Sequence, residues 1–145
     1  MQLVVKSFEE LSLEELYEIL KIRVAVFVVE QNCPYQEIDD KDKRSFHLYL
    51  KDEKGILAYC RVVEAEVSYK EVSIGRVISV RRNCGLGEMI VKEGIRIAQE
   101  KLQAKAIRIG AQVYAKGFYQ KFGFEQVSQQ YLEDGIWHIE MLLKL

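Results

Sequence analysis

The stretch that decides the fold reads Val72-Ser73-Ile74-Gly75-Arg76-Val77-Ile78-Ser79-Val80, and it is followed at once by Arg81-Arg82-Asn83-Cys84-Gly85-Leu86-Gly87. The first run is rich in β-branched residues and predicts a strand, whereas the second is short and polar, contains two glycines and predicts a connection. From residue 88 to residue 102 the apolar side chains recur every three or four positions, which is typical of a helix that packs one face on a sheet. The stretch therefore predicts a strand, a glycine turn and a helix in direct succession.

Downstream of this unit the sequence alternates between short strands and a short helix. Residues 106–111 read as a strand, and residues 114–122 read as a helix that Gly123 ends. Residues 124–130 and 136–143 then predict a final hairpin around the turn at residues 133–135.

Upstream of the unit, the sequence predicts a strand at residues 2–6 and then one long helix. The capping-box pattern Ser12-Leu13-Glu14-Glu15 begins this helix, because the serine hydroxyl and the second glutamate satisfy free backbone N–H groups at a helix start. Apolar side chains recur at helical spacing to about Val29, and Arg23 lies within their stripe. Pro34, the single proline of the chain, cannot continue the helix.

Two further strands fill the remaining part of the chain. We interpret the acidic residues 37–42 as a solvated loop, and residues 46–51 and 56–63 as a hairpin. Several strands in succession, followed by alternation with helices, predict an α/β fold with a mixed sheet and helices on its faces. We expect residues 1–145 to form a single domain.

Composition excludes several classes of function. Lys and Arg number 21 and Asp and Glu number 22, which gives a formal net charge of -1 and no positive field for nucleic acid or an anionic membrane. The N-terminus has no signal-peptide pattern and no apolar run approaches a membrane span, so we expect a cytoplasmic protein. Three cysteines without a C-x-x-C pair predict neither a disulfide framework nor a zinc or other metal site.

The glycine turn at residues 82–87 is the most informative segment for chemistry. Two glycines between a strand end and a helix start leave backbone N–H groups free, and the helix adds the positive end of its dipole. A pyrophosphate could bind there, with Arg82 contributing a charged contact. The Walker pattern fails because Gly87 precedes Glu88-Met89, and the dinucleotide fingerprint fails because Ile90 occupies the position of its third small residue.

These residues resemble a known family. Residues 82–87 are similar to the Arg-x-x-Gly-x-Gly acetyl-CoA turn of the GNAT superfamily of N-acetyltransferases, and residues 111–124 are similar to its fourth helix, with its Phe-Tyr-x-x-x-Gly-Phe ending at 118–124. Further runs resemble the ElaA-type branch of the superfamily: residues 23–31, 33–35, 37–39, 74–77 and 133–139. Together these similarities cover nearly the whole chain.

The resemblance implies a GNAT-like, mostly antiparallel sheet that is splayed between two central strands and flanked by helices, with acetyl-CoA as cosubstrate in the gap. It also implies direct attack by a primary amine of a small molecule or peptide, with a backbone N–H polarising the acetyl carbonyl and Tyr119 protonating the departing thiolate. The residues that it assigns to the cofactor are Val77, Ile78, Ser79, Arg82, Asn83, Cys84, Gly85, Leu86, Gly87, Gln112 and Tyr119.

A general base must accept the proton of the attacking amine, and several side chains are candidates. Glu30 and His138 rank first. The other carboxylates and the other imidazole of the acceptor side stay open: Glu37, Asp39, Asp42, His47 and Glu140. Each histidine could equally be a strand residue satisfied by hydrogen bonds, and acidic residues on the acceptor side would favour a cationic amine.

The turn departs from the family pattern at two points. Asn83 stands where the first glycine is usual, and the short approach from Ile78 to Arg82 lacks the usual proline. Asn tolerates left-handed backbone angles, so the turn can survive the change. An alternative function is therefore a CoA-binding sensor or assembly module without efficient catalysis, and Cys84 adds a thiol that could be oxidised or coupled to CoA. An exposed last strand would also allow edge-to-edge pairing into a homodimer.

Overall fold

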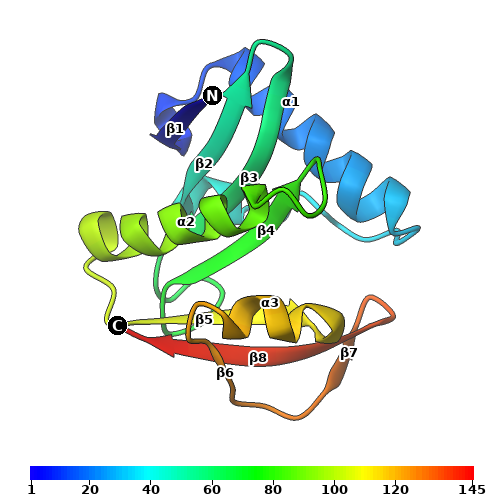
Figure 1. Ribbon diagram of the computed structural model, residues 1–145, viewed down its shortest axis with the longest axis vertical. Coiled ribbons are helices and arrows are strands. Elements are labelled where there is room, and N and C mark those ends of the chain that lie inside the picture. Colours follow the sequence, from blue (N-terminus) through cyan, green and yellow to red (C-terminus); the bar gives the residue numbers. More distant parts are fainter.

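The computed structural model of residues 1–145 contains two four-stranded sheets (Figure 1). The strands of the first sheet, in spatial order, are β1 (Gln2–Ser7), β2 (Ser45–Asp52), β3 (Gly55–Val63) and β4 (Ser73–Ser79). The second sheet has the order β5 (Ala106–Gln112), β8 (Ile136–Lys144) and β6 (Glu125–Gln126), and β7 (Tyr131–Glu133) also pairs with β8. Every strand pair within the two sheets is antiparallel.

Three α-helices cover these sheets. They are α1 (Leu13–Val24), which continues as a π-helical segment over Ala25–Glu30, then α2 (Leu86–Leu102) and α3 (Lys116–Gln120). Single 3-10 turns lie at Phe8–Glu10, Lys41–Arg44 and Val113–Ala115. In Figure 1, α2 crosses the first sheet and α3 lies over the second, on the side nearest the viewer. None of the helices has both the length and the apolar character needed to cross a membrane.

The two sheets touch at one end only. Val72 forms a parallel bridge with Ile107, and the Arg108 N–H donates to the Val72 carbonyl at 3.0 Å. Beyond this bridge β4 pairs only with β3, and β5 pairs only with β8, so the two central strands diverge. The predicted α/β fold with a mostly antiparallel, splayed sheet is therefore confirmed.

A β-bulge in β4 directs its two halves to opposite faces of the first sheet. Arg76 and Val77 together lie opposite Cys60, since Gly75 pairs with Arg61 and Ile78 pairs with Tyr59. The extra residue reverses the alternation of side chains, so residues that would otherwise share a face do not. Before the bulge, Ile74 packs in the larger core beneath α2; after it, Ile78 packs in the smaller core beneath α1.

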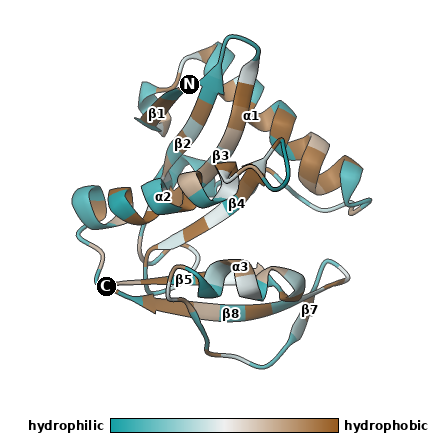
Figure 2. Cartoon of the chain, viewed as in Figure 1, coloured by the Kyte–Doolittle hydropathy of each residue, from teal (hydrophilic) through white to brown (hydrophobic).

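The larger core is shared by both sheets and holds them together. It joins Ile90, Val91 and Ile97 of α2 to Ile107 of β5 and Met141 of β8. In Figure 2 the hydrophobic colour lies on α1 as well as on strands such as β5 and β8, whereas much of the side of α2 that faces the viewer is hydrophilic. This is the pattern expected for an amphipathic helix on a sheet, and the helix predicted at 88–102 is confirmed with a start two residues earlier, at Leu86.

Two details at the C-terminal end differ from the sequence prediction. Residues 124–130 do not form one strand, because the chain leaves β8 after β6 and returns only at β7. Between them, the Ser128 hydroxyl accepts the Glu140 N–H at 2.8 Å in place of a strand partner. The last strand is also not an edge, since β8 lies between β5 and the β6–β7 segment, so the edge pairing expected from that strand is wrong.

The start of α1 has the predicted capping box and an additional tie to the sheet. The Glu15 carboxylate accepts the Ser12 N–H at 2.9 Å and the Lys6 ammonium at 2.8 Å, and the Tyr49 hydroxyl also donates to it. Burial alone would raise the pKa of Glu15, but these donors lower it from 4.5 to about 2. The charged form of this carboxylate therefore stabilises the junction of α1, β1 and β2.

We predict that Glu15→Gln flattens the acid limb of the stability profile. Because the folded-state pKa is depressed, the charge of Glu15 contributes stability above pH 4.5 and loses that contribution as the pH falls toward about 2. Urea unfolding of both proteins between pH 6 and pH 2 measures the difference. Glu14→Gln, an exposed neighbour in the same helical turn, is the control; equal slopes for wild type and Glu15→Gln would contradict this assignment.

Candidate active site

The glycine turn ends in a helix N-terminus with no side-chain cap. Asn83 (φ 59°) and Gly85 (φ 78°) both adopt the left-handed conformation, and Gly85 is the N-cap of α2. The N–H groups of the first turn of a 17-residue helix are thus free to bind an anion. The substitution of asparagine for the usual glycine is accommodated by the backbone, as Asn is one of the residues that enter this region most readily.

The turn also lies beside α3. A side-chain carbon at Gly87 would meet Phe118 of α3 at 3.6 Å and Ser79 of β4 at 3.8 Å. The two segments singled out in the sequence, residues 82–87 and 111–124, are therefore adjacent in space. At the exposed part of the turn, Cys84 donates its thiol to the Arg81 carbonyl at 3.2 Å.

A groove, here named the turn-side groove, leads from the turn along the end of β4. Its volume is about 880 Å³ and most of its lining is hydrophobic. Five of the residues predicted for the cofactor lie in it, Arg82 among them, together with Glu30. The lining residues are Ile22, Ala25, Val26, Phe27, Glu30, Gln31, Val77, Ile78, Ser79, Val80, Arg82, Gln112, Tyr114 and Ile136.

A second space, the central cavity, lies where β4 and β5 diverge. Its volume is about 180 Å³, and its walls include Gly75–Val77 of β4 and Ile109–Gln112 of β5. The cavity and the groove are continuous because they share Phe27, Gln31, Val77, Gln112, Tyr114 and Ile136. A ligand that began at the glycine turn could therefore reach the gap between the central strands.

Tyr119 and His138 both line the central cavity. The Tyr119 ring is fixed edge-on against Phe118 and Phe124, with centroid separations of 5.1 and 5.9 Å. Burial raises the pKa of the Tyr119 phenol, so it remains protonated at neutral pH. A phenol held in this way is suited to donate a proton and unsuited to accept one.

The hydrogen bonds of His138 determine which ring nitrogen is free. Its Nδ1 lies 2.7 Å from the Ile136 carbonyl, which can only accept, so Nδ1 carries the proton of the neutral ring. Nε2 is then the atom with the lone pair, and it lies 3.7 Å from a Glu133 carboxylate oxygen. The ring also stacks on Tyr131 at 5.9 Å. The imidazole is thus oriented with an acceptor nitrogen available.

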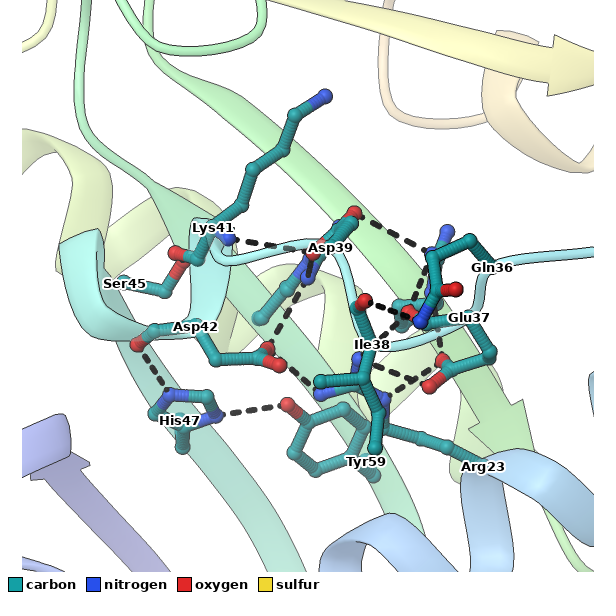
Figure 3. A network of polar contacts seen from close by, with 12 residues as sticks. Arg23, Gln36, Glu37, Ile38, Asp39, Lys41, Asp42, Ser45, His47 and Tyr59 are labelled. Carbon is teal, nitrogen blue, oxygen red and sulfur yellow. Dashed lines mark hydrogen bonds and ion pairs between the residues drawn. The ribbon is translucent and has the colours of Figure 1, made fainter.

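The acidic loop is not solvated, which corrects the sequence interpretation. Glu37 and Asp42 are buried beside Arg23, a fully buried residue of α1. Figure 3 shows Arg23 between these two carboxylates, which it binds at 2.8 and 2.6 Å. Burial alone would raise the pKa of Asp42, but Arg23 and Arg61 hold it below its ordinary value. The loop turns inward because buried arginines need these charges.

Asp39 belongs to the same ion network. Arg61 binds it at 2.7 Å, and Arg76 binds both Asp39, at 3.3 Å, and Glu37, at 2.8 Å. Burial opposes ionisation of Asp39, yet the two guanidinium groups lower its pKa below the ordinary value. A carboxylate whose pKa is lowered in this way is a poor base. Because Glu37, Asp39 and Asp42 are all bound to arginines, the network explains these three open candidates as structural residues.

The two remaining open candidates are also engaged elsewhere. His47 is fully buried, with Nε2 donating to the Asp42 carbonyl at 2.9 Å and Nδ1 accepting the Tyr59 hydroxyl at 2.7 Å (Figure 3). Burial lowers the pKa of His47 and keeps it neutral. Glu140 binds Arg108 at 3.1 Å. His47 is therefore the strand histidine satisfied by hydrogen bonds that the sequence also allowed.

The structure gives a place in the site to two residues for which sequence reasoning assigned no role, Gln31 and Arg76. The Gln112 amide donates to the Gln31 amide oxygen at 3.2 Å, joining the end of β5 to the chain after the π-helical segment. Arg76 has a left-handed backbone (φ 52°) at the bulge, and its guanidinium lies over Tyr35 at 5.5 Å and Phe27 at 5.9 Å. Both lie within the runs that resemble the ElaA-type branch, but neither had a signal of its own, whereas Arg23 had one as a charge inside an apolar helical stripe.

Comparison with known proteins gives consistent matches over the whole chain. A family model described as "Acetyltransferase (GNAT) domain" matches residues 9–145. Protein ElaA of Escherichia coli K12 is 39% identical over 136 residues, which cover 91% of this chain and 89% of that protein. The crystal structure of E. coli ElaA superposes with a TM-score of 0.90 over 97% of each chain at 36% identity. An acyl-CoA N-acyltransferase from Pseudomonas aeruginosa gives the same TM-score and identity over 98% of this chain and 99% of that one.

We predict that Arg23→Met destabilises the protein by about 3–5 kcal/mol, since it leaves Glu37 and Asp42 buried without their partner. Urea unfolding at pH 7 measures this loss. The control is Arg44→Met, which removes an exposed ion pair with Glu64 and should cost no more than about 1 kcal/mol. Similar losses for the two variants would show that the buried network does not hold the loop.

Proposed function

The chain belongs to the GNAT acetyltransferase family, and from this we propose that it transfers an acetyl group from acetyl-CoA to a primary amine of a small molecule or peptide by direct attack. The similarity to an acyl-CoA N-acyltransferase of P. aeruginosa supports both the acyl-CoA donor and the nitrogen acceptor. We propose that the acyl group transferred is acetyl, that the acceptor is a primary amine, and that residues of the groove and the central cavity have the roles that follow.

One observation carries the proposal: the glycine turn, which ends in the uncapped helix N-terminus at Gly85, borders at Arg82 a continuous space that ends between β4 and β5. An anion-binding end, a largely apolar groove and a small central cavity match the pyrophosphate, the pantetheine arm and the thioester in that order. When bound, acetyl-CoA supplies an activated acyl group. Arg82 lies at the groove and would contact the pyrophosphate.

Backbone and amide groups would hold the pantetheine arm. Beyond the Val72 bridge the edge of β4 that faces β5 is unpaired, so the backbone groups of Val77–Ser79 that do not bond to β3 are available at the groove. Gln31 and Gln112 line both the groove and the central cavity and already form an amide–amide hydrogen bond. The same groups can exchange this bond for one with a pantetheine amide.

Tyr119 and His138 would handle the two protons of the reaction. The acetyl C–S bond breaks as the N–C bond forms, the Tyr119 phenol protonates the departing thiolate, and the Nε2 lone pair of His138 accepts the amine proton directly or through water. Because burial raises the pKa of the Tyr119 phenol, the proton required for the acid role is present at neutral pH. Glu30 lies in the turn-side groove and is absent from the central cavity lining, so we assign the base role to His138.

We predict that Arg82→Gln weakens acetyl-CoA binding about tenfold, because one charge-assisted contact to the pyrophosphate is lost. Isothermal titration with acetyl-CoA measures the dissociation constant, with ATP as the comparison ligand. Arg81→Gln, the adjacent exposed arginine, is the matched control and should bind as wild type. Equal affinities for Arg82→Gln and Arg81→Gln would remove Arg82 from the site, and tighter binding of ATP than of acetyl-CoA would contradict the donor.

We predict that Tyr119→Phe lowers kcat about 100-fold or more and leaves the affinity for acetyl-CoA close to wild type, since only the proton donor is removed. Release of free CoA thiol in the presence of an amine measures the rate. Tyr114→Phe, on an exposed ring at the same cavity, controls for loss of a phenol as such. An unchanged kcat in Tyr119→Phe would exclude its acid role, and acetyl-CoA binding without thiol release for any amine would favour a sensor or assembly module.

A further inference from the structure

A third space, the outer cavity, adjoins the central cavity on the side away from the glycine turn. Its volume is about 540 Å³, and most of its lining is polar. It shares seven lining residues with the central cavity and none with the turn-side groove. The shared residues are Tyr35, Ile74, Gly75, Arg76, Gly110, Glu133 and Asp134. An acceptor in this space would meet the thioester from the side opposite the cofactor.

One wall of the outer cavity carries an unused positive charge. The arginines of the ion network are balanced by its three carboxylates, but Lys41 has no ion-pair partner. Figure 3 shows its side chain extending away from the network, and Lys41 lines the cavity. Arg61, on the same wall, has the one buried side-chain polar atom without a partner, its Nε. Lys41 thus presents an uncompensated charge to the cavity, and Arg61 retains one unused hydrogen-bond donor.

The opposite wall is acidic and comes from the second sheet. Glu133 and Asp134 line both the outer and the central cavity. Asp134 has no ion pair, and Glu133 has only the His138 Nε2 at 3.7 Å, which carries no charge while that ring is neutral. Beside them, the hydroxyls of Tyr69 and Tyr131 converge on Gly110, at 2.8 and 3.0 Å from where its side-chain carbon would lie. Burial raises the pKa of both phenols and the nearby carboxylates raise it further, so this wall favours a cation.

We propose that the amine acceptor is a zwitterion, a free amino acid whose amine lies at Glu133 and Asp134 and whose carboxylate lies at Lys41 and Arg61. This inference rests on the proposed acetyl transfer and names its acceptor class. The acidic residues border the central cavity, so the amine is the end nearest the thioester. Lys41 and Arg61 line only the outer cavity, which puts the carboxylate farther out.

The charges of the cavity distinguish this class from the alternatives. A diamine would satisfy the acidic wall but would set a second positive charge before Lys41 and leave Arg61 Nε without an acceptor. A neutral amine would use neither wall beyond its own nitrogen. The transfer balances when the ammonium group of the zwitterion first gives one proton to solvent through His138, since only the neutral amine can attack. The amine then gains the acetyl group and loses a second proton to His138, while Tyr119 protonates the thiolate. The products are an N-acetyl amino acid and CoA, with one proton released overall.

The test compares matched acceptors with acetyl-CoA at saturating concentration. We measure kcat/KM by thiol release for a panel of free amino acids, for the carboxamides of the same amino acids, and for 1,4-diaminobutane. The expected result is at least a tenfold preference for the best amino acid over its carboxamide. In Lys41→Met this ratio should fall toward 1, because the partner of the carboxylate is gone. Lys43→Met, an exposed lysine of the same 3-10 turn, should keep both the ratio and the rate.

The outcomes separate this inference from the one on which it depends. Turnover in which carboxamides or the diamine equal the amino acids would overturn the zwitterion assignment and leave the acetyl transfer intact. A preference that persists in Lys41→Met would overturn the role of the cationic wall. Saturable acetyl-CoA binding with no thiol release for any acceptor would overturn the proposed catalysis, and the acceptor class with it.

Discussion

The backbone of Arg76 is the constraint on which the site depends. A left-handed conformation for a non-glycine residue costs about 1–3 kcal/mol and persists only where its surroundings determine it. Here Glu37 and Asp39 bind the guanidinium, and two aromatic rings lie against it. The bulge that results turns Ile74 toward α2 and Ile78 toward α1, and the central cavity lies beside it where β4 and β5 diverge.

The ion network therefore links the stability of the fold to the shape of the site. Arg23 anchors the loop after α1, the same loop supplies the carboxylates that hold Arg76, and Arg76 borders both the central and the outer cavity. Buried ion pairs are costly to desolvate and add little net stability, so a role in fixing one geometry explains better why this core is charged. The polar groups of the outer cavity extend from the same network.

Local patterns in the sequence were sufficient to predict most of the helices and strands. Hydrophobic spacing located α2, the capping box at Ser12 located α1, and the glycine turn located the uncapped start of α2, because each depends on residues close together in the chain. Tyr119 was identified by resemblance alone. The acidic loop was misread because its partners Arg61 and Arg76 are distant in sequence, and a charged run is usually solvated. The three connected spaces and the Gln31–Gln112 pair depend on how the two sheets splay, which no local pattern encodes.

The central claim is that the space from the glycine turn to the gap between β4 and β5 binds acetyl-CoA. The most direct measurement is a titration of the labelled protein with acetyl-CoA, followed through its backbone amide NMR signals. The account predicts saturable shifts at Gly85–Gly87 and at Val77–Ser79, with Tyr119 and its neighbours affected by the acetyl end. Shifts confined to another surface, such as the polar turn at residues 51–54, or no saturable shift at all, would contradict it.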